Sequence, residues 1–410
     1  MRIAMLHPSL TWRGGAERQL LRMAIELQGM GHEIEIFTNS VNDRCYPEMR
    51  DKLVVHELQH PLVKSLRRSK NSSTSNANSD FSLGQRGLTY RLRAPLRGYV
   101  SNFPNMLDMG RKIPKGFDLI NNHNYPTEWA AFFAKKRLKV PVVWTCNEPP
   151  FWFTDENQKK GLGIINAPLF EGLDKVAVNY VDKIVVVSAI GRARVEQAYA
   201  KPSEIVNPGA DFEFQNASGQ ETRLKYGLGN DFVLLSVGNI AADKRQSDSI
   251  LALYYLSKKH KDVKLMLRGE GPLENLIELS RKLGVEDKIL FLPACSDKEL
   301  ADAYAACDAF IFPAQITWGL VVIEAMAASK PVVVSKKCGV SEIITDGFNG
   351  LIFEASNPRD LALKVEELIS DRSLGGAIGR HAHEYVVKYL SWKNYAKRME
   401  SIFRQVAFNN

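Results

Sequence analysis

The chain of 410 residues is poor in cysteine and has no apolar run long enough to cross a bilayer. Its five cysteines are scattered, and no two of them have CxxC spacing; they are Cys45, Cys146, Cys295, Cys307 and Cys338. An odd and scattered set argues against a disulfide framework and against a zinc site, and is typical of reduced thiols in the cytoplasm. A spanning helix needs about 20 apolar residues, so none is expected.

Metal-binding and dinucleotide-binding patterns are also missing. No Asp-x-Asp pair and no His/Glu cluster with metal-ligand spacing occurs, so we expect no metal and no bound cofactor. No G-x-G-x-x-G follows the first apolar segment, and the second ends Phe37-Thr38-Asn39 without an acidic residue for an adenosine ribose. Both absences weaken a dinucleotide site, although a nicotinamide-dependent oxidoreductase stays open as an alternative.

The composition is that of a globular protein, with 45% hydrophobic and 24% charged residues, and the length predicts two domains. The net charge of +8 is concentrated between residues 60 and 115, where eleven Lys and Arg stand against two Asp, a local balance of +9. Such a segment suits anionic lipid, a lipid-linked pyrophosphate or nucleic acid, or is simply a solvated basic loop. Within it, 69–79 lacks large apolar residues, which predicts disorder.

Short apolar segments alternate with amphipathic ones along most of the chain. We predict strands at 2–6, 33–38, 53–57, 119–121, 140–145 and 183–188, then at 232–237, 263–268, 289–292, 309–312 and 331–335. Helices are expected between them, for example at 16–28. This alternation predicts an α/β protein with two doubly wound parallel sheets. The alternation of strands and helices is interrupted at 200–214, which contains Asn207-Pro208-Gly209, and this predicts the linker between the domains. A further helix is expected at 392–406 and could pack on either domain.

Two glycine-containing turns could hold phosphate. Gly14 and Gly15 stand between the first strand and the first helix, where backbone can approach a ligand and helix amides face an anion, or where a tight turn needs glycine. In the second domain, Gly238 ends a strand and Lys244 follows six residues later, a plausible diphosphate cradle; a surface ion pair is the alternative for Lys244.

Two further side chains are placed for chemistry. His123 follows a predicted strand, at the edge of a doubly wound sheet where ligands bind. Glu324 lies in a short helix after the turn at Gly319 and Leu320, close to a helix N-terminus. An isolated His or Glu is more often an ordinary surface residue than a functional one. The prediction of a site therefore depends on the order in which all of these features occur along the chain.

That order resembles the retaining glycosyltransferases of family 4, which have the GT-B fold of two Rossmann-like domains. The matching segments are Gly14-Gly15-Ala16-Glu17-Arg18, 117–124, 145–150, 207–211, 236–245, 265–272 and 318–327. The resemblance implies that Glu324 holds the ribose of a nucleotide-sugar donor, Lys244 its pyrophosphate, and that Gly269 lies near its base. It places His123 beside the transferred sugar and the Gly14 loop between donor and acceptor phosphates. In this fold the last helix returns to the first domain, which gives domains of 1–206 with about 388–410, and 207–387.

The chain departs from the family pattern at several positions. Asn239 replaces an arginine, for which Arg245 and Arg268 are the candidate substitutes, and Asn121 replaces the first histidine of an H-x-H pair. Ile316 stands where the first glutamate of an E-x7-E pair belongs, so we expect the donor sugar to be recognised by other groups, such as backbone amides at 317–319.

The expected function is metal-independent transfer of a hexose-type sugar from a GDP- or UDP-linked donor to a hydroxyl of a glycan or polyprenyl-linked acceptor, with retention of configuration. The expected location is the cytoplasm, with peripheral contact between the basic 60–115 segment and anionic membrane, and no nucleic acid is expected as a partner. A nucleotide-sugar epimerase and an inactive transferase-like subunit remain as alternatives beside the oxidoreductase.

Overall fold

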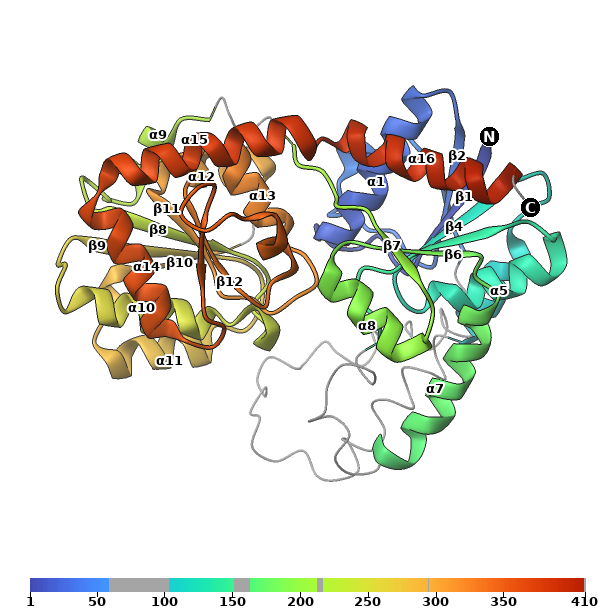
Figure 1. Cartoon of the computed structure of the whole chain (residues 1–410), viewed down its shortest axis with the longest axis horizontal. Helices are drawn as coiled ribbons and strands as arrows, with labels where there is room; N and C mark the ends of the chain where they lie inside the picture. Colours follow the sequence, from blue (N-terminus) through green and yellow to red (C-terminus); the bar gives the residue numbers. More distant parts are fainter. Residues whose placement is uncertain (59–102, 151–162, 212–216, 294, 409–410) are drawn as a thin grey trace, which may run out of the picture. The chain divides into compact units, whose positions relative to one another are not determined.

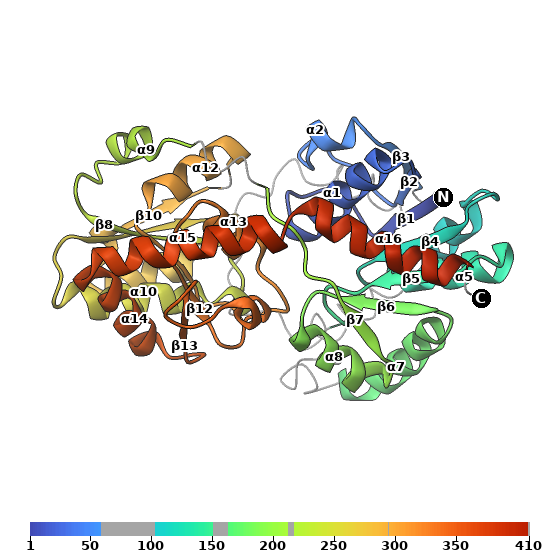
Figure 2. The ribbon, with the colours of Figure 1, turned by 45° about the horizontal axis from the view of Figure 1, so that its top comes forward.

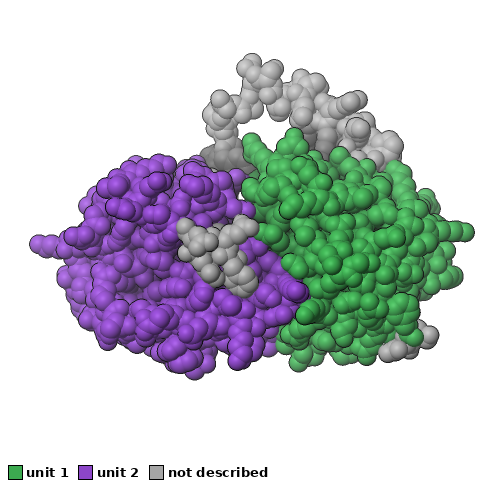
Figure 3. All heavy atoms as spheres, turned by 90° about the horizontal axis from the view of Figure 1, so that it is seen from above, with its two compact units in different colours: residues 1–187, 191–206, 396–410 green, residues 188–190, 207–395 purple. Residues whose placement is uncertain are grey.

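The computed structural model describes residues 1–58, 103–150, 163–211, 217–293 and 295–408. They form two compact units (Figure 3). The first unit holds 1–187, 191–206 and 396–410, and the second holds 188–190 and 207–395. Each unit has its own parallel sheet with helices on both faces, so the predicted pair of doubly wound α/β sheets is confirmed (Figure 1).

The first unit has a seven-stranded sheet in the order β3-β2-β1-β4-β5-β6-β7. The strands are β1 (Arg2–His7), β2 (Glu33–Thr38), β3 (Val54–Glu57), β4 (Leu119–His123), β5 (Val142–Thr145), β6 (Lys183–Val186) and β7 (Ser203–Ile205). The helices are α1 (Gly15–Gly29), α2 (Pro47–Arg50), α5 (Thr127–Leu138), α7 (Gly163–Asn179), α8 (Ala189–Tyr199) and α16 (Trp392–Phe408). Figures 1 and 2 show α1 and α16 on one face of the sheet and α5, α7 and α8 on the other.

The second unit has a six-stranded sheet in the order β10-β9-β8-β11-β12-β13. The strands are β8 (Phe232–Val237), β9 (Val263–Arg268), β10 (Ile289–Leu292), β11 (Ala309–Phe312), β12 (Val332–Ser335) and β13 (Leu351–Phe353). The main helices are α9 (Gly219–Lys225), α10 (Gln246–Ser257), α11 (Glu274–Leu283), α12 (Asp297–Ala306), α13 (Leu320–Ala327), α14 (Pro358–Ser370) and α15 (Arg372–Tyr389). Helices α10, α11 and α14 cover one face, and α12, α13 and α15 cover the other (Figure 1).

Local chemistry explains where several of these helices begin and end. A capping box opens α12, because Ser296 Oγ accepts from the Glu299 amide while Glu299 Oε2 accepts from the Ser296 amide. Asp371 caps α15 by accepting from the amides of residues 373 and 374. Helix α11 ends at Leu283 and is followed by the C-cap residue Gly284, whose φ of 67° suits glycine.

The structure differs from the sequence prediction at several places. Strand β4 runs on through His123, two residues beyond the predicted end, and its polar residues are buried. Strand β7 lies inside the stretch that we predicted as linker, and β13 was not predicted. Residues 388–395, which we expected in the first domain, group with the second unit. They are held there by the hydrogen bond from the Ala210 amide to the carbonyl of Leu390 and by the close packing of Gly209 on Trp392.

Candidate functional site

The predicted site residues gather at equivalent places in the two sheets. In each unit the strand order reverses beside its first strand, between β1 and β4 in the first unit and between β8 and β11 in the second. The crevice outside the carboxyl ends of the strands at such a switch point is where open α/β sheets bind ligands. The Gly14 loop follows β1 and His123 ends β4; the Gly238 loop follows β8 and the Gly319 turn follows β11.

In the second unit, the turns after β8 and β9 pack backbone against backbone. The Gly238 amide donates to the carbonyl of Arg268 at 3.0 Å, and the Ile240 amide donates to the carbonyl of Glu270 at 2.7 Å. A Cβ atom on Gly269 would lie 2.0 Å from the carbonyl oxygen of Gly238. Gly238 itself has a φ of 151°, which few other residues adopt. Two glycines therefore allow these turns to lie in contact at the edge of the sheet.

Lys244 reaches back over the Gly238 turn. A Cβ on Gly238 would lie 3.9 Å from Cδ of Lys244, and the ammonium group pairs with Asp243 Oδ2 at 2.7 Å. The Gln246 side chain fixes the turn by donating to the carbonyl of Asn239 at 2.9 Å. The carbonyl of Asp243 accepts from the Gln315 amide at 2.8 Å, which joins this loop to the one after β11. Lys244 thus presents a cation beside Gly238 at the switch point.

The two candidate substitutes for the missing arginine differ in their partners. Arg245 donates to both carboxylate oxygens of Asp248, at 2.7 and 3.1 Å. Arg268 is buried; its Nη1 donates to the carbonyl of Pro293 at 3.4 Å, and its Nε meets no acceptor among the described residues. Arg268 is therefore the better placed of the two for an anion.

Glu324 is buried, not solvated, in the second turn of α13. Its Oε2 accepts from the hydroxyl of Tyr304 on α12 at 3.0 Å. Gly319 is the N-cap of α13, and a Cβ there would lie 3.0 Å from the ring of Phe312, so a larger residue would be crowded. Leu320, the first residue of the helix, is partly exposed. This end of α13 offers backbone amides and a held carboxylate.

In the first unit, the carboxyl group of Glu17 lies beside Gly14 at the start of α1. Gly14 is the N-cap residue and Gly15 the exposed first residue of the helix. The Glu17 side chain folds back, so that a Cβ on Gly14 would lie 2.3 Å from its Oε2. Partial burial raises the pKa of Glu17 to about 7, against the lowering effect of its own backbone amide. The carboxyl group occupies the place over the helix N-terminus where an anion would bind.

His123 is fully buried at the end of β4. Its Nε2 lies 2.7 Å from Asn121 Oδ1, while the Asn121 amide donates to the carbonyl of Val143 at 2.9 Å and to Thr145 Oγ1 at 3.1 Å. Burial holds the pKa of His123 well below its usual value, and the nearby His7 lowers it further. His123 is therefore neutral, which disfavours a role as a charged acid.

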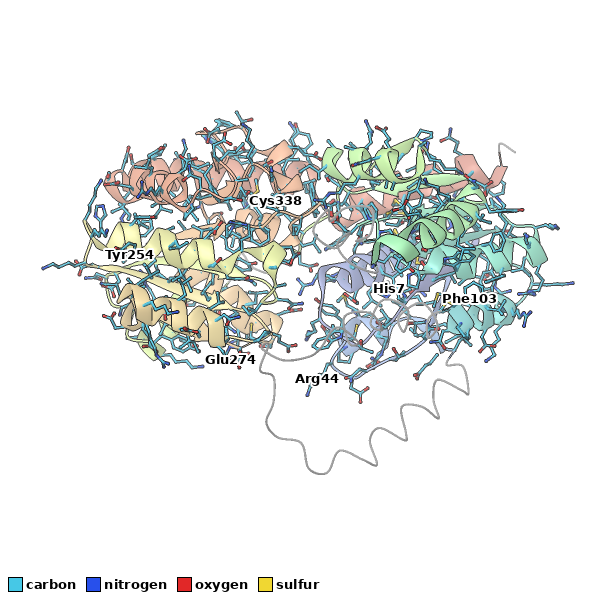
Figure 4. The ribbon with its side chains drawn as sticks, turned by 90° about the horizontal axis from the view of Figure 1, so that it is seen from below. His7, Arg44, Phe103, Tyr254, Glu274 and Cys338 are labelled. Carbon is cyan, nitrogen blue, oxygen red and sulfur yellow. The ribbon has the colours of Figure 1, made fainter. Side chains whose placement is uncertain are left out.

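His7 ends the neighbouring strand β1, and Figure 4 labels its side chain in the first unit. Its Nδ1 donates to the carbonyl of Ser9 at 2.8 Å, and its Nε2 accepts from Asn124 Nδ2 at 3.2 Å. Burial lowers the pKa of His7 to about 4, partly offset by the bond to Ser9. Two neutral histidines thus lie at this switch point.

A buried pair of carboxyl groups lies near this edge, and the sequence analysis missed it. Glu128 lies in the first turn of α5, shortly after β4, and neither of its oxygens meets a donor among the described residues. Burial, and then the charge of Asp174, raise the pKa of Glu128 well above its usual value. Asp174 on α7 accepts from Trp129 Nε1 at 3.0 Å. Only the position of Glu128 just after a strand could have drawn attention to the pair.

Other partners found here also gave no sequence signal, among them Tyr304 for Glu324 and Gln246 for the Gly238 turn. Most of the basic 60–115 segment, including 69–79, lies outside the described residues. Across the described ranges, no group of three or more His, Cys, Asp or Glu residues has an arrangement that could hold a metal ion. Nor does any helix within those ranges have the length and apolar character needed to span a bilayer.

Two sequence-family models match most of the chain. The sequence model of Glycosyltransferase Family 4 matches residues 13–214, and that of Glycosyl transferases group 1 matches residues 220–385. The first match includes the Gly14 loop and His123, and the second includes Lys244 and Glu324.

Individual relatives are similar over most of the chain. The D-inositol 3-phosphate glycosyltransferase of Thermobispora bispora is 26% identical over 411 residues, covering 96% of this chain and 90% of that protein. The GDP-mannose-dependent alpha-(1-6)-phosphatidylinositol monomannoside mannosyltransferase of Mycobacterium tuberculosis is 25% identical over 300 residues, 70% and 77% of the two chains. The crystal structure of Anabaena HepE with UDP-glucose has a TM-score of 0.75 at 18% identity and covers 99% of this chain and 100% of that one. This likeness shows the GT-B fold.

Proposed function

Because the chain belongs to the glycosyltransferases of family 4 and group 1, and is thus a sugar transferase, we propose that it moves a hexose-type sugar from a nucleoside diphosphate donor to a hydroxyl group of a glycan or polyprenyl-linked acceptor. The observation that carries the proposal is the arrangement at the β8–β11 switch point, where Lys244 lies over the Gly238 turn and the loop after β11 is bonded to the same segment. The family matches count against the oxidoreductase alternative.

In the proposed complex, the donor diphosphate binds at the Gly238 turn and the N-terminus of α13. Lys244 and Arg268 would supply positive charge, and the amides that follow Gly319 would add partial positive charge at the helix end. These groups would stabilise the nucleoside diphosphate as it leaves, which lowers the barrier most where charge develops. Because these groups would stabilise the charge of the leaving group, we also propose that the transfer needs no metal ion.

Glu324 would accept hydrogen bonds from the ribose of the donor. Tyr304 already bonds one of its oxygens, so the carboxylate is held in place before the nucleotide arrives. Gly269 lies where the nucleoside base would approach the turn after β9. HepE was crystallised with UDP-glucose and the mycobacterial relative is GDP-mannose-dependent, so UDP and GDP are both reasonable donors to test.

The acceptor would bind to the first unit, at the β1–β4 switch point that holds the Gly14 loop and His123. Retention of configuration is proposed from the family alone. Peripheral contact between the 60–115 segment and anionic lipid is proposed from the positive charge of that segment. We also propose that the protein is cytoplasmic and makes this contact at the cytoplasmic face of the membrane. Co-sedimentation with vesicles that is independent of their anionic lipid content would contradict that contact.

Thermal unfolding with UDP, GDP, ADP and NAD tests the donor site. A ligand at 100 times its dissociation constant stabilises the native state by about 2.7 kcal/mol, a shift of a few degrees. We expect one nucleoside diphosphate to stabilise the wild type and Lys244→Ala to weaken that ligand about ten- to a hundredfold, the worth of a charge-assisted hydrogen bond. Lys259→Ala is the matched control, because Lys259 pairs with Glu366 on the exposed face of the same unit.

Acceptor-dependent release of the nucleoside diphosphate then tests the reaction. Release only when an acceptor is present supports the transferase. Interconversion of sugars without acceptor would indicate the epimerase, and nucleotide binding without any turnover would indicate the inactive subunit. Stabilisation by NAD alone would contradict the proposal.

A further inference from the structure

The loop that follows β8 carries two neighbouring ion pairs. Nζ of Lys244 donates to Oδ2 of Asp243 at 2.7 Å. Nε and Nη2 of Arg245 donate to the two carboxylate oxygens of Asp248, at 2.7 and 3.1 Å. Both pairs belong to the second unit and follow the strand at its switch point.

The two pairs differ in how readily they can open. The Asp243 side chain is 51% exposed, so water can hydrate its carboxylate once the ammonium group leaves. An exposed ion pair of this kind contributes little to stability. The Asp248 side chain is only 5% exposed, and removing its cation would leave a buried carboxylate uncompensated, which is costly. Lys244 can therefore change partner, whereas Arg245 stays with Asp248.

The backbone around Lys244 is already fixed. The amide of Gln315 donates to the carbonyl of Asp243 at 2.8 Å. The amide of Lys244 donates to the carbonyl of Ala241 at 3.1 Å. A Cβ on Gly238 would lie 3.9 Å from Cδ of Lys244, so the methylene chain of the lysine already reaches the turn. An exchange of partner therefore moves the ammonium group and the Asp243 side chain and leaves the loop in place.

We propose that Asp243 acts through Lys244 as a positioning residue: it holds the ammonium group in the free protein, gives it up when a nucleoside diphosphate binds, and so lowers the affinity for donor and product. The inference rests on the proposed function, which places the diphosphate at the Gly238 turn. A carboxylate oxygen and a phosphate oxygen compete for the same ammonium group, because both are anionic acceptors. The product is released more readily than it would be from a lysine without this competitor.

Calorimetric titration of the full chain with UDP, GDP and inorganic pyrophosphate tests the exchange. We expect Asp243→Asn to bind the effective diphosphate about two- to fivefold more tightly than the wild type, the worth of an exposed ion pair. Asp243→Glu, which keeps the carboxylate, should retain the affinity of the wild type. Glu278→Gln is the matched control, because it removes the same charge from an exposed pair with Lys282 on α11 of the same unit.

A double-mutant comparison separates exchange of partner from simple repulsion. Asp243→Asn should not tighten binding in the Lys244→Ala protein, because no ammonium group is left to compete for. An equal gain in both backgrounds would show that the charge of Asp243 repels the ligand directly, and it would overturn the proposal. The proposal also fails if Asp243→Asn binds the diphosphate no more tightly than the wild type does.

Initial rates add a readout that a purely structural role would leave unchanged. In Asp243→Asn, the inhibition constant of the nucleoside diphosphate product should fall by the same factor as its dissociation constant, and in Glu278→Gln it should not change. A wild type that binds a diphosphate but transfers no sugar would contradict the proposed function, and the binding comparison would still decide the role of Asp243. A wild type that binds none of the three ligands would contradict both.

Discussion

The hydroxyl group of Tyr304 lies 3.0 Å from Oε2 of Glu324 and 3.0 Å from the carbonyl oxygen of Val321. A phenol has one proton, so it serves these two acceptors in turn and ties α12 to α13. We expect Tyr304→Phe to destabilise the second unit by about 2 kcal/mol, because a hydrogen bond to a charged group is worth about 1.5–3 kcal/mol. Urea unfolding measures this. Tyr254→Phe, which removes a hydroxyl from α10 of the same unit, is the control.

Gly269→Ala should damage both folding and nucleotide binding in the second unit. Its Cβ would lie 2.0 Å from the Gly238 carbonyl, and backbone cannot move aside as a flexible side chain can. We expect a loss of roughly 2 kcal/mol or more in stability, in the range of overpacked sites, and weaker nucleoside diphosphate binding by calorimetry. Gly376 lies inside α15, and outside its own helix backbone a Cβ there would meet only the Arg380 side chain among the described residues within 4 Å. Gly376→Ala should therefore be neutral or stabilise by about 0.5–1 kcal/mol. A stable Gly269→Ala protein with unchanged affinity would show that the two turns need not touch.

Glu17 should make stability depend on pH near neutrality. The pKa of Glu17 in the folded protein is raised to about 7. The free energy of unfolding is therefore highest below the pKa that Glu17 has in the unfolded chain, where the carboxyl group is protonated in both states, and it falls as the pH rises to about 7. We expect Glu17→Gln to gain stability relative to the wild type between pH 5 and pH 8. Solvent screening keeps the slope below the limit of about 1.4 kcal/mol per pH unit for one proton. Parallel thermal melts of the two proteins, with Glu26→Gln on the same helix as control, would show no such divergence if the carboxyl group were solvated.

Glu128→Gln should stabilise the first unit at high pH. The folded pKa of Glu128 is raised by burial and by Asp174, so the wild type loses stability as pH rises, whereas the amide stays neutral and can donate to Asp174. We expect a gain on the order of 1–3 kcal/mol at pH 8 and little change at pH 5, measured by urea unfolding. Glu196→Gln on the exposed side of α8 controls for the loss of charge. A destabilised Glu128→Gln at pH 8 would mean that the charged carboxylate is needed.

The sequence was a good guide where the pattern was long and apolar. Strand β12 contains Val332-Val333-Val334, and consecutive β-branched apolar residues predict a buried strand of a parallel sheet. Strands β7 and β13 have three residues each, too few for any periodicity. The last two residues of β4 were missed because Asn122 is a poor strand former, and its hydrogen bond to Thr127 makes it acceptable inside the sheet.

In the candidate site too, some residues could be found from the sequence and others could not. Positions next to strand ends, such as Gly238 and His123, could be found because chain order places them at a sheet edge. Their partners could not, because Tyr304 and Glu324 are 20 residues apart and Trp129 and Asp174 are 45 apart, with no pattern that joins them. The state of a side chain depends on such partners, so sequence alone could not say that Glu324 is buried or that His123 is neutral.

The first unit is not continuous along the chain, because residues 396–410 belong to it although the whole second unit precedes them. Within that unit, Glu400 on α16 lies 2.9 Å from Nε2 of His32, and Arg398 donates to the carbonyl of Ile205. On the ribosome, which adds about 5–20 residues per second, the first unit must therefore wait many seconds for its last helix while the second unit emerges. The first unit, although it contains the amino terminus, can therefore complete its folding only after the second unit has been synthesised.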